Sequence, residues 1–154
     1  MCGIVGVVAN YPISQLLYNS LNGVQHRGQQ AAGMATMDGN LMHLKKGLGL
    51  IRQSISSYDL SYLKGSAGIG HVRFPTAGSA DDPEQAHPFY VNSPFGIMLA
   101  HNGNLINADR LRNHLEIDGT IFQSTSDSEV ILNLIAKRAR LGIGKAISET
   151  CQTI

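Results

Sequence analysis

Short hydrophobic runs and amphipathic stretches alternate along the chain, and their spacing predicts most of its helices and strands. The Val- and Ile-rich run at residues 3–9 predicts a buried strand. The segment after Pro12 predicts a helix, because its hydrophobic residues recur at helical spacing. The apolar face of that helix would contain Ile13, Leu16, Leu17, Leu21 and Val24.

The middle of the chain predicts four more strands. Residues 31–37 and 41–44 flank Asp38-Gly39-Asn40, a sequence typical of a β-hairpin turn. Two further strands are predicted at residues 67–73 and 95–101, the second of them well buried. Residues 74–88 between them are rich in Gly, Pro, Ala and Asp, which predicts a long loop. Loops of this length are often functional.

A helix is predicted after residue 107, because Asn107 can cap a segment that carries Leu111 and Leu115. Gly119 would end this helix.

A second C-terminal helix begins at the capping-box sequence of residues 126–129. Its apolar face would contain Val130, Ile131, Leu134, Ile135 and Leu141. Gly142 and Gly144 would break it, and residues 145–154 would begin a further helix. Strand pairs that look antiparallel, with helices interspersed, indicate an α+β fold of layered sheets and helices.

Length and composition favour one globular domain. The chain has 154 residues, of which 43% are hydrophobic, enough to supply a core. Charged residues make up 15%, below the roughly one quarter of an average protein. Two explanations of this low charge stay open: a surface covered by a partner, or a compact Gly-rich domain with few surface charges.

Charge and hydropathy argue against several classes of function. The net charge is +1 and there is no basic run, so neither nucleic acid nor an anionic membrane is expected as a partner. No apolar run is long enough to span a membrane and no signal peptide is visible, so we expect a cytoplasmic protein. Cys2 and Cys151 cannot by themselves form a disulfide framework or a zinc site.

Cys2 directly follows the initiator methionine. Removal of Met1 would give Cys2 both a thiol and a free α-amine. The pKa of an unperturbed thiol is ~8.5 and that of an α-amine is ~7.7–8.0, so the amine can act as the thiol's general base near neutral pH. The alternative is that Cys2 is an ordinary small residue at the start of a strand.

Three other sites have groups suited to binding or catalysis. Asn102 and Gly103 follow a predicted strand, and an Asn amide plus a Gly N–H can stabilise an oxyanion. Arg73 ends another strand and could bind a carboxylate. Asp127 could bind an ammonium group. The respective alternatives are a turn, a surface salt bridge and a favourable charge in the first turn of a helix.

Five segments share a pattern when they are taken in order: Met-Cys-Gly-Ile-Val-Gly at 1–6, Gln-His-Arg-Gly-Gln at 25–29, His-Val-Arg-Phe-Pro-Thr-Ala-Gly at 71–78, His-Asn-Gly-Asn-Leu at 101–105 and Thr-Ser-Asp-Ser-Glu at 125–129. As a set they resemble the glutaminase domain of class II (N-terminal-nucleophile) glutamine amidotransferases. The resemblance covers residues 1–154.

Within this family, the segments at 25–29, 101–105 and 125–129 are similar to those of the amidophosphoribosyltransferases, which begin purine synthesis. Glucosamine-6-phosphate synthases, an alternative, tend to have Tyr-Arg-Gly-Tyr-Asp in place of residues 25–29. Phe74 departs from the Tyr or Trp that is more frequent in the family, which removes a hydroxyl group but no reacting group.

The resemblance implies a fold and a site. The fold would be the four-layer αββα sandwich of N-terminal-nucleophile hydrolases, with antiparallel sheets, incomplete at its C-terminus. Cys2 would attack the carboxamide of glutamine, and Asn102 and Gly103 would hold the oxyanion. Ammonia would leave, and water would release glutamate.

The remaining residues implied by the resemblance bind the substrate. Arg73 would bind the α-carboxylate of glutamine and Asp127 its α-ammonium. Thr76 would belong to a loop that closes over the substrate. A base other than the α-amine is not required, so His26, His71 and His101 are interpreted as structural or interface residues.

The resemblance also implies what lies outside this chain. The phosphoribosyltransferase domain of the longer family enzymes is absent from residues 1–154, and Mg²⁺ and any iron–sulfur cluster would belong to that part. No cofactor and no metal is expected within this chain. Glutamine is the expected ligand, with homo-oligomerisation or contact with a phosphoribosyltransferase domain. The alternative is a non-catalytic fragment or regulatory chain of the same lineage.

Overall fold

The computed structural model describes residues 1–74 and 82–154, and the chain divides into two compact units. Unit 1 is formed by Met1–Pro88 and Ala100–Asn102, and unit 2 by Phe89–Leu99 and Gly103–Ile154. Each unit combines antiparallel strands with helices. The α+β class predicted from the sequence is therefore confirmed.

Unit 1 is built on a four-stranded antiparallel sheet with the order β1-β4-β2-β3. Its strands are β1 (Gly3–Val8), β2 (Ala31–Asp38), β3 (Leu41–Leu48) and β4 (Ala67–Arg73). All four begin where the sequence predicts them, but β3 extends four residues beyond its predicted end at residue 44. Gly39 and Asn40 form the predicted turn between β2 and β3. The prediction that β1 is buried is wrong. It is an edge strand whose side chains alternate between the two faces, and Ile4 and Val8 are exposed.

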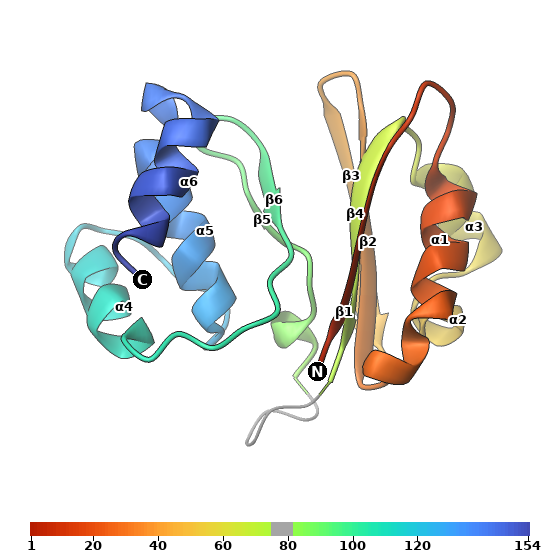
Figure 1. The fold of residues 1–154 in the computed structure, drawn as a ribbon, viewed down its shortest axis with the longest axis horizontal. Coiled ribbons are helices and arrows are strands. Elements are labelled where there is room, and N and C mark those ends of the chain that lie inside the picture. The colour runs from red at the N-terminus through yellow and green to blue at the C-terminus, as the bar shows by residue number, and fades with distance from the viewer. Residues whose placement is uncertain (75–81) are drawn as a thin grey trace. The chain divides into compact units, whose positions relative to one another are not determined.

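Three helices cover one face of this sheet (Figure 1). They are α1 (Ser14–Gly23), α2 (Ile51–Ser54) and α3 (Ser57–Tyr62). The core between helices and sheet contains Ile13, Leu17, Leu21, Ala32, Met34, Ile51, Ile55, Leu63 and Val72. Leu16 was predicted on the apolar face of α1 but is exposed. The sequence pattern missed α2 and α3, because helices of 4 and 6 residues are too short to show a helical period.

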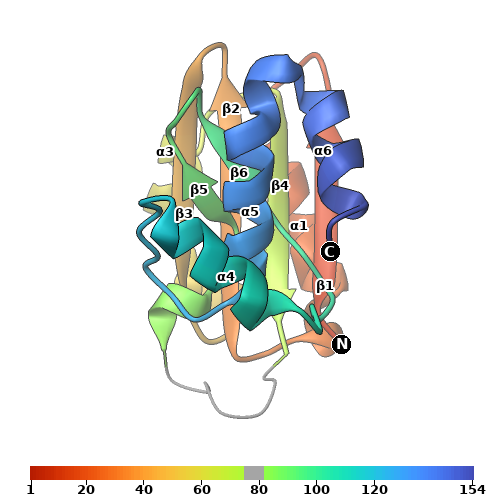
Figure 2. The same cartoon turned by 90° about the vertical axis from the view of Figure 1, so that its left-hand side faces the viewer.

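Unit 2 contains a two-stranded hairpin of β5 (Phe89–Val91) and β6 (Ile97–Leu99). Its helices are α4 (Ala108–Ile117), α5 (Asp127–Arg138) and α6 (Ile143–Cys151). Helix α5 packs on the hairpin and is flanked by α4 and α6 (Figure 2). The prediction of a well-buried strand at residues 95–101 is too long, since β6 has only three residues, all of them half-buried.

The predicted capping details of unit 2 are partly wrong. Asn107 precedes α4, but its side-chain amide donates to the Thr153 carbonyl at 3.1 Å instead of capping the helix. Gly142 has a φ of +99° and separates α5 from α6, as predicted, whereas Gly144 lies inside α6. The side chain of Leu141 lies outside the described part of the chain.

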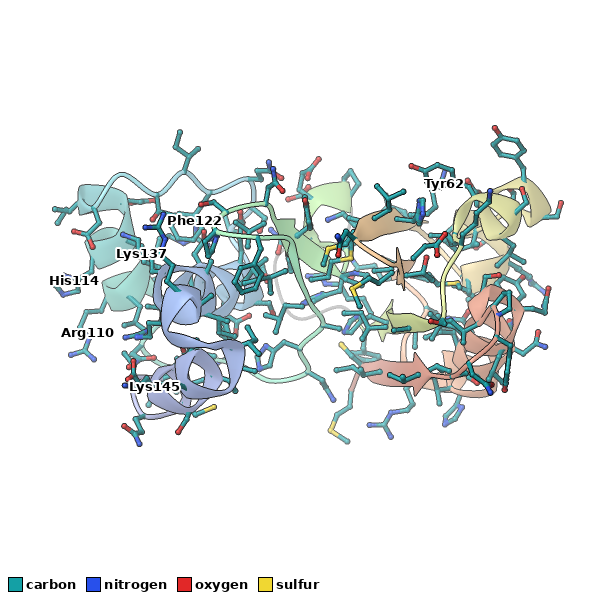
Figure 3. All side chains as sticks on the ribbon, turned by 90° about the horizontal axis from the view of Figure 1, so that it is seen from above. Tyr62, Arg110, His114, Phe122, Lys137 and Lys145 are labelled. Atoms are coloured by element: carbon teal, nitrogen blue, oxygen red, sulfur yellow. The ribbon has the colours of Figure 1, made fainter. Side chains whose placement is uncertain are left out.

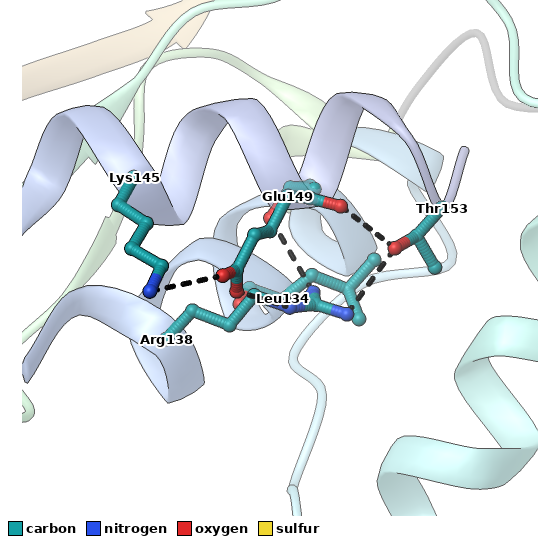
Figure 4. A network of polar contacts seen from close by, with 6 residues as sticks. Leu134, Arg138, Lys145, Glu149 and Thr153 are labelled. Carbon is teal, nitrogen blue, oxygen red and sulfur yellow. Dashed lines mark hydrogen bonds and ion pairs between the residues drawn. The ribbon is translucent and has the colours of Figure 1, made fainter. Parts of the chain in front are cut away.

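An ionic network joins α5 to α6 (Figure 4). The Arg138 guanidinium donates to the hydroxyls of Thr150 and Thr153 at 3.4 and 3.2 Å. The two carboxylate oxygens of Glu149 form ion pairs, one with the Arg138 Nε at 3.9 Å and the other with the Lys145 Nζ at 3.8 Å. The half-buried Arg138 side chain is at the centre of this network and links α6 to α5.

Glu129 organises the start of α5 without forming the predicted capping box. Ser126 accepts a hydrogen bond from the Ser128 N–H at 3.2 Å, so it does cap the helix. The Glu129 carboxylate instead accepts from the N–H groups of Gln123 and Ser124, both at 2.8 Å, and from the Ser124 hydroxyl at 2.7 Å. Glu129 is only 6% exposed, so these bonds are shielded from water.

Replacing Glu129 with alanine is expected to lower the free energy of unfolding by about 2–4 kcal/mol, because three donors lose a buried, charged acceptor. Urea denaturation of the wild type and of Glu129→Ala measures this difference. Glu116→Ala, an exposed residue on α4, is the control and should stay within about 0.5 kcal/mol of the wild type. Equal stabilities of the two variants would contradict the structural role of Glu129.

Candidate active site

The Cys2 side chain lies at the end of the sheet where β4 finishes. Gly3, the first residue of β1, pairs with Val72 of β4, which places Cys2 opposite the end of that strand. The N–H of Phe74 donates to the Cys2 Sγ atom at 3.3 Å. Cys2 is half-buried, so the thiol contacts the protein and is still accessible to solvent.

Two side chains hold the backbone carbonyl of Cys2. The Arg27 Nε donates to it at 3.0 Å and the Asn102 Nδ2 at 3.4 Å. Asn102 is therefore next to the predicted nucleophile, although 100 positions separate them. Arg27 was not predicted as a site residue. Its only signal in the sequence was its place within the segment at residues 25–29.

That segment also positions the end of β4. Gly28 packs so closely on the strand that a Cβ atom there would lie 2.5 Å from the carbonyl carbon of Arg73, so only glycine fits. The N–H of Gln30 donates to the Arg73 carbonyl at 3.0 Å. The Gln25 side chain accepts a hydrogen bond from the Ile51 N–H at 2.7 Å and so anchors the turn to α2. Cys2 and Arg73 are thus located by the same short turn.

Arg73 is a buried cation within unit 1. Its side chain is 7% exposed, and its Nη1 donates to the Gln30 Oε1 at 2.7 Å. Burial lowers the pKa of the guanidinium, while the charges of Cys2 and Asp82 act in the opposite direction. The burial of this cation favours an anionic ligand.

The other two predicted residues that the structure describes, Gly103 and Asp127, belong to unit 2. Asp127 is the first residue of α5, and its Oδ2 accepts a hydrogen bond from the Leu105 N–H at 2.8 Å. Its Oδ1 accepts from the Ser128 hydroxyl at 3.3 Å. Asp127 thus ties the turn after Gly103 to the helix, in addition to any role toward substrate. Thr76 lies outside the described residues, as do the other residues of 75–81 in the predicted loop.

Residues 56–151, more than half of the chain, match the family model described as a glutamine amidotransferase domain. The chain belongs to this family. The class II assignment made from the five sequence segments agrees with this match.

Relatives of this glutamine amidotransferase domain are named amidophosphoribosyltransferase. The chain is 51% identical over 138 residues to the enzyme of Escherichia coli and 50% identical over 137 residues to that of Pseudomonas aeruginosa. Each alignment covers 88% of this chain and 27% of the relative. The chain is also 44% identical over 140 residues to the enzyme of Methanocaldococcus jannaschii, covering 89% of this chain and 30% of that one. The chain therefore spans less than a third of these relatives' length.

Solved structures show the same fold. One, described as the allosteric regulatory enzyme of purine biosynthesis, has a TM-score of 0.89 and 36% identity, and the match covers 99% of this chain and 33% of that one. The glutamine phosphoribosylpyrophosphate amidotransferase of B. subtilis, complexed with ADP and GMP, has a TM-score of 0.87 and 34% identity, with the same coverage. The predicted N-terminal-nucleophile-hydrolase type of fold is therefore confirmed. The predicted incompleteness at the C-terminus stays a prediction.

The amidotransferase domain buries two histidines near Arg73. His71 of β4 is fully buried, and the His87 side chain is 6% exposed. Their rings stack, with centroids 4.3 Å apart and planes at 27°. Burial lowers the pKa of His71 to about 4 and, together with the nearby cationic groups, that of His87 to about 2. Both rings are therefore neutral at physiological pH.

Among the described residues of the amidotransferase domain, no group of three or more His, Cys, Asp or Glu side chains could hold a metal ion. In the same residues, no helix is both long enough and apolar enough to cross a membrane. The expectation that no cofactor binds this chain stays a prediction.

Proposed function

We propose that this chain is a glutaminase domain that hydrolyses glutamine to glutamate and ammonia with Cys2 as nucleophile. One observation carries the proposal. Unit 1 places Cys2 next to the amide of Asn102 and opposite the end of β4, where the guanidinium of Arg73 is buried. A nucleophile, an oxyanion donor and a carboxylate-binding cation are what hydrolysis of an amino-acid amide requires.

The reaction needs Met1 to be removed, so that Cys2 has a free α-amine. The amine accepts the thiol proton as the sulfur attacks the carboxamide carbon of glutamine. The side chain of Asn102 and the N–H of Gly103 donate to the oxyanion of the tetrahedral intermediate. The C–N bond then breaks, the amine returns the proton to the leaving ammonia, and water hydrolyses the thioester to glutamate.

Arg73 and Asp127 select an α-amino acid. The guanidinium of Arg73 pairs with the α-carboxylate in a bidentate geometry, and Asp127 binds the α-ammonium. Thr76, which follows Arg73 by three positions in the sequence, would also bind the substrate. An amide without an α-carboxylate and an α-ammonium would lose both contacts, so glutamine is preferred over simple amides.

In the whole protein, the ammonia would aminate phosphoribosyl pyrophosphate to phosphoribosylamine in purine biosynthesis. The names of the relatives, at 44–51% identity, support this assignment. The phosphoribosyltransferase step, its Mg²⁺ and any iron–sulfur cluster would belong to a part outside residues 1–154. The protein would be cytoplasmic, and would form homo-oligomers or contact a phosphoribosyltransferase domain.

Intact-mass measurement with a glutamine-mimicking electrophile tests the proposed glutaminase. We expect the purified chain to lack Met1 and to gain one adduct, which glutamine should suppress by competition. Cys151 is an exposed thiol that could react without any site, so the experiment is run in a Cys151→Ala background. Cys2→Ala in the same background should gain no adduct.

The outcomes separate the proposal from its alternative. Loss of Met1 with one Cys2-dependent, glutamine-protected adduct supports the glutaminase. An unmodified mass from a chain with a folded circular-dichroism spectrum favours a non-catalytic chain of the same lineage.

A further inference from the structure

The segment Asp82–Pro88 lies on the sheet of unit 1 and is held there by both side chains and backbone. It includes the short 3-10 helix η2 (Pro83–Gln85). The ammonium of Lys46, on β3, donates to the Ala86 carbonyl at 2.8 Å. A Cβ atom on Gly33 of β2 would collide with the His87 carbonyl, so the backbone approaches this strand as closely as glycine permits. We call Asp82–Pro88 the return segment.

The His71–His87 stack joins the return segment to β4. His71 lies two residues before Arg73 on the same strand and on the same face, because side chains alternate along a strand. His87 lies near the end of the return segment, with its ring stacked on that of His71 at 4.3 Å. Aromatic stacking of two buried rings fixes both position and orientation. The strand that ends at Arg73 and the return segment are thereby held together.

The Asp82 carboxylate fixes the start of the return segment. One Asp82 carboxylate oxygen accepts from the Glu84 N–H at 2.9 Å and the other from the Gln85 side chain at 3.3 Å, so the carboxylate is fixed within its own segment. Burial lowers the pKa of Arg73, and the negative charge of Asp82 opposes this lowering. The return segment therefore contributes a negative charge to the electrostatic environment of Arg73.

We propose that His87 is a positioning residue for Arg73: by stacking on His71 it holds the return segment against β4, the strand that ends at Arg73. This inference rests on the proposed role of Arg73 in binding glutamine. His87 acts only through the return segment and contacts no substrate.

The surroundings of the stack make it sensitive to acid. The titratable and charged groups that act on His87 are His71 and Arg73 of β4, His101 of the 100–102 segment and Lys46 of β3. Those that act on His71 by charge are Arg73 and His101. Arg73 and Lys46 are cations, and both histidines of the stack have a lowered pKa.

The direction of the pH effect follows from these lowered pKa values. A histidine released from the stack binds a proton below its ordinary pKa of about 6.5, whereas the stacked ring does not. The stack is therefore fully formed above about pH 6.5, and release becomes more favourable as the pH falls from there toward 4.

The first test is steady-state glutamine hydrolysis by the full chain at neutral pH. His87→Ala removes the stacked ring and should raise the KM for glutamine about tenfold with kcat changed less than about twofold. His87→Phe keeps a stacking ring without a titrating group and should restore the wild-type KM. The control is His114→Ala, since His114 is exposed and extends outward from α4 (Figure 3).

The second test is hydrogen exchange of the Gln85 and Ala86 amides, which donate within the return segment at 3.1 Å. Their protection in the wild type should fall as the pH drops below 6.5, and should fall less steeply in His87→Phe, which keeps only His71 as a titrating group of the stack. Met34 of the central strand β2 reports global unfolding and should keep its protection over the same range.

Each result has a distinct meaning. A KM for His87→Ala equal to that of the control would overturn the positioning role. So would a KM for His87→Phe raised as much as that of His87→Ala. A wild type that does not hydrolyse glutamine would reject the proposed function instead, and hydrogen exchange would still decide whether the stack holds the return segment.

Discussion

Replacing Asn102 with alanine is expected to lower kcat for glutamine hydrolysis by about 10²–10³-fold, with a small change in KM. Removal of one oxyanion donor costs about 2.7–4 kcal/mol of transition-state stabilisation in comparable sites. The amide of Asn102 is already close to the nucleophile, since it donates to the Cys2 carbonyl at 3.4 Å. Asn102→Asp has nearly the same shape but no donor and should lose at least as much activity. Asn113→Ala, on the exposed side of α4, is the control.

The same contact raises a second explanation for a loss of activity, because Asn102 also helps to hold the backbone of Cys2. Alkylation of Cys2 by iodoacetamide separates the two, since this displacement at a saturated carbon forms no oxyanion. In a Cys151→Ala background, the alkylation rate of Asn102→Ala should stay within about twofold of its parent. Parallel losses in alkylation and in hydrolysis would mean that Asn102 only positions Cys2.

The strands of unit 1 were predictable because their signals are local. The Gly39-Asn40 turn and the hydrophobic runs of β2 and β4 can be recognised within windows of ten residues. Helices α2 and α3 and the three-residue β5 are too short for such a signal. Their positions depend on packing against residues far away in the sequence, which periodicity does not report.

The candidate site was predictable as a set of residue types and not as a geometry. Nothing in their spacing shows that Cys2 adjoins Phe74 and Asn102, because this requires β1 to pair with β4 and not with its neighbour in sequence. Their association was inferred from a family resemblance. Roles such as that of Arg27 depend on a single side chain reaching a backbone carbonyl, and sequence alone does not specify such a contact.

Capping illustrates the same limit at a smaller scale. Ser126 and Glu129 have the correct spacing for a capping box, yet Glu129 bonds to Gln123 and Ser124 instead. The preceding loop offers three donors at once, whereas the capping box would satisfy only the Ser126 N–H. A buried carboxylate is better stabilised by the larger number of hydrogen bonds.

Replacing Arg73 with lysine is expected to lower kcat/KM for glutamine by about 10²-fold, mainly through a higher KM. Lysine keeps the positive charge but loses the planar fork that makes two parallel bonds to a carboxylate. It also loses the geometry of the 2.7 Å bond from Nη1 to Gln30, which orients the guanidinium. A charge-assisted hydrogen bond contributes about 1.5–3 kcal/mol, so the loss of one such bond accounts for a change of this size.

Substrate analogues show whether the loss comes from the α-carboxylate. Steady-state kinetics with glutamine and with glutamine α-amide, which lacks that carboxylate, would be compared in the wild type and in Arg73→Lys. If Arg73 binds the carboxylate, the wild type should use the α-amide poorly, and Arg73→Lys should lose little further activity toward it. Arg52→Lys, on the exposed side of α2, should match the wild type with both substrates. If Arg73→Lys lowered kcat/KM equally with the two substrates, Arg73 would have a structural role at the end of β4. Another group would then bind the α-carboxylate.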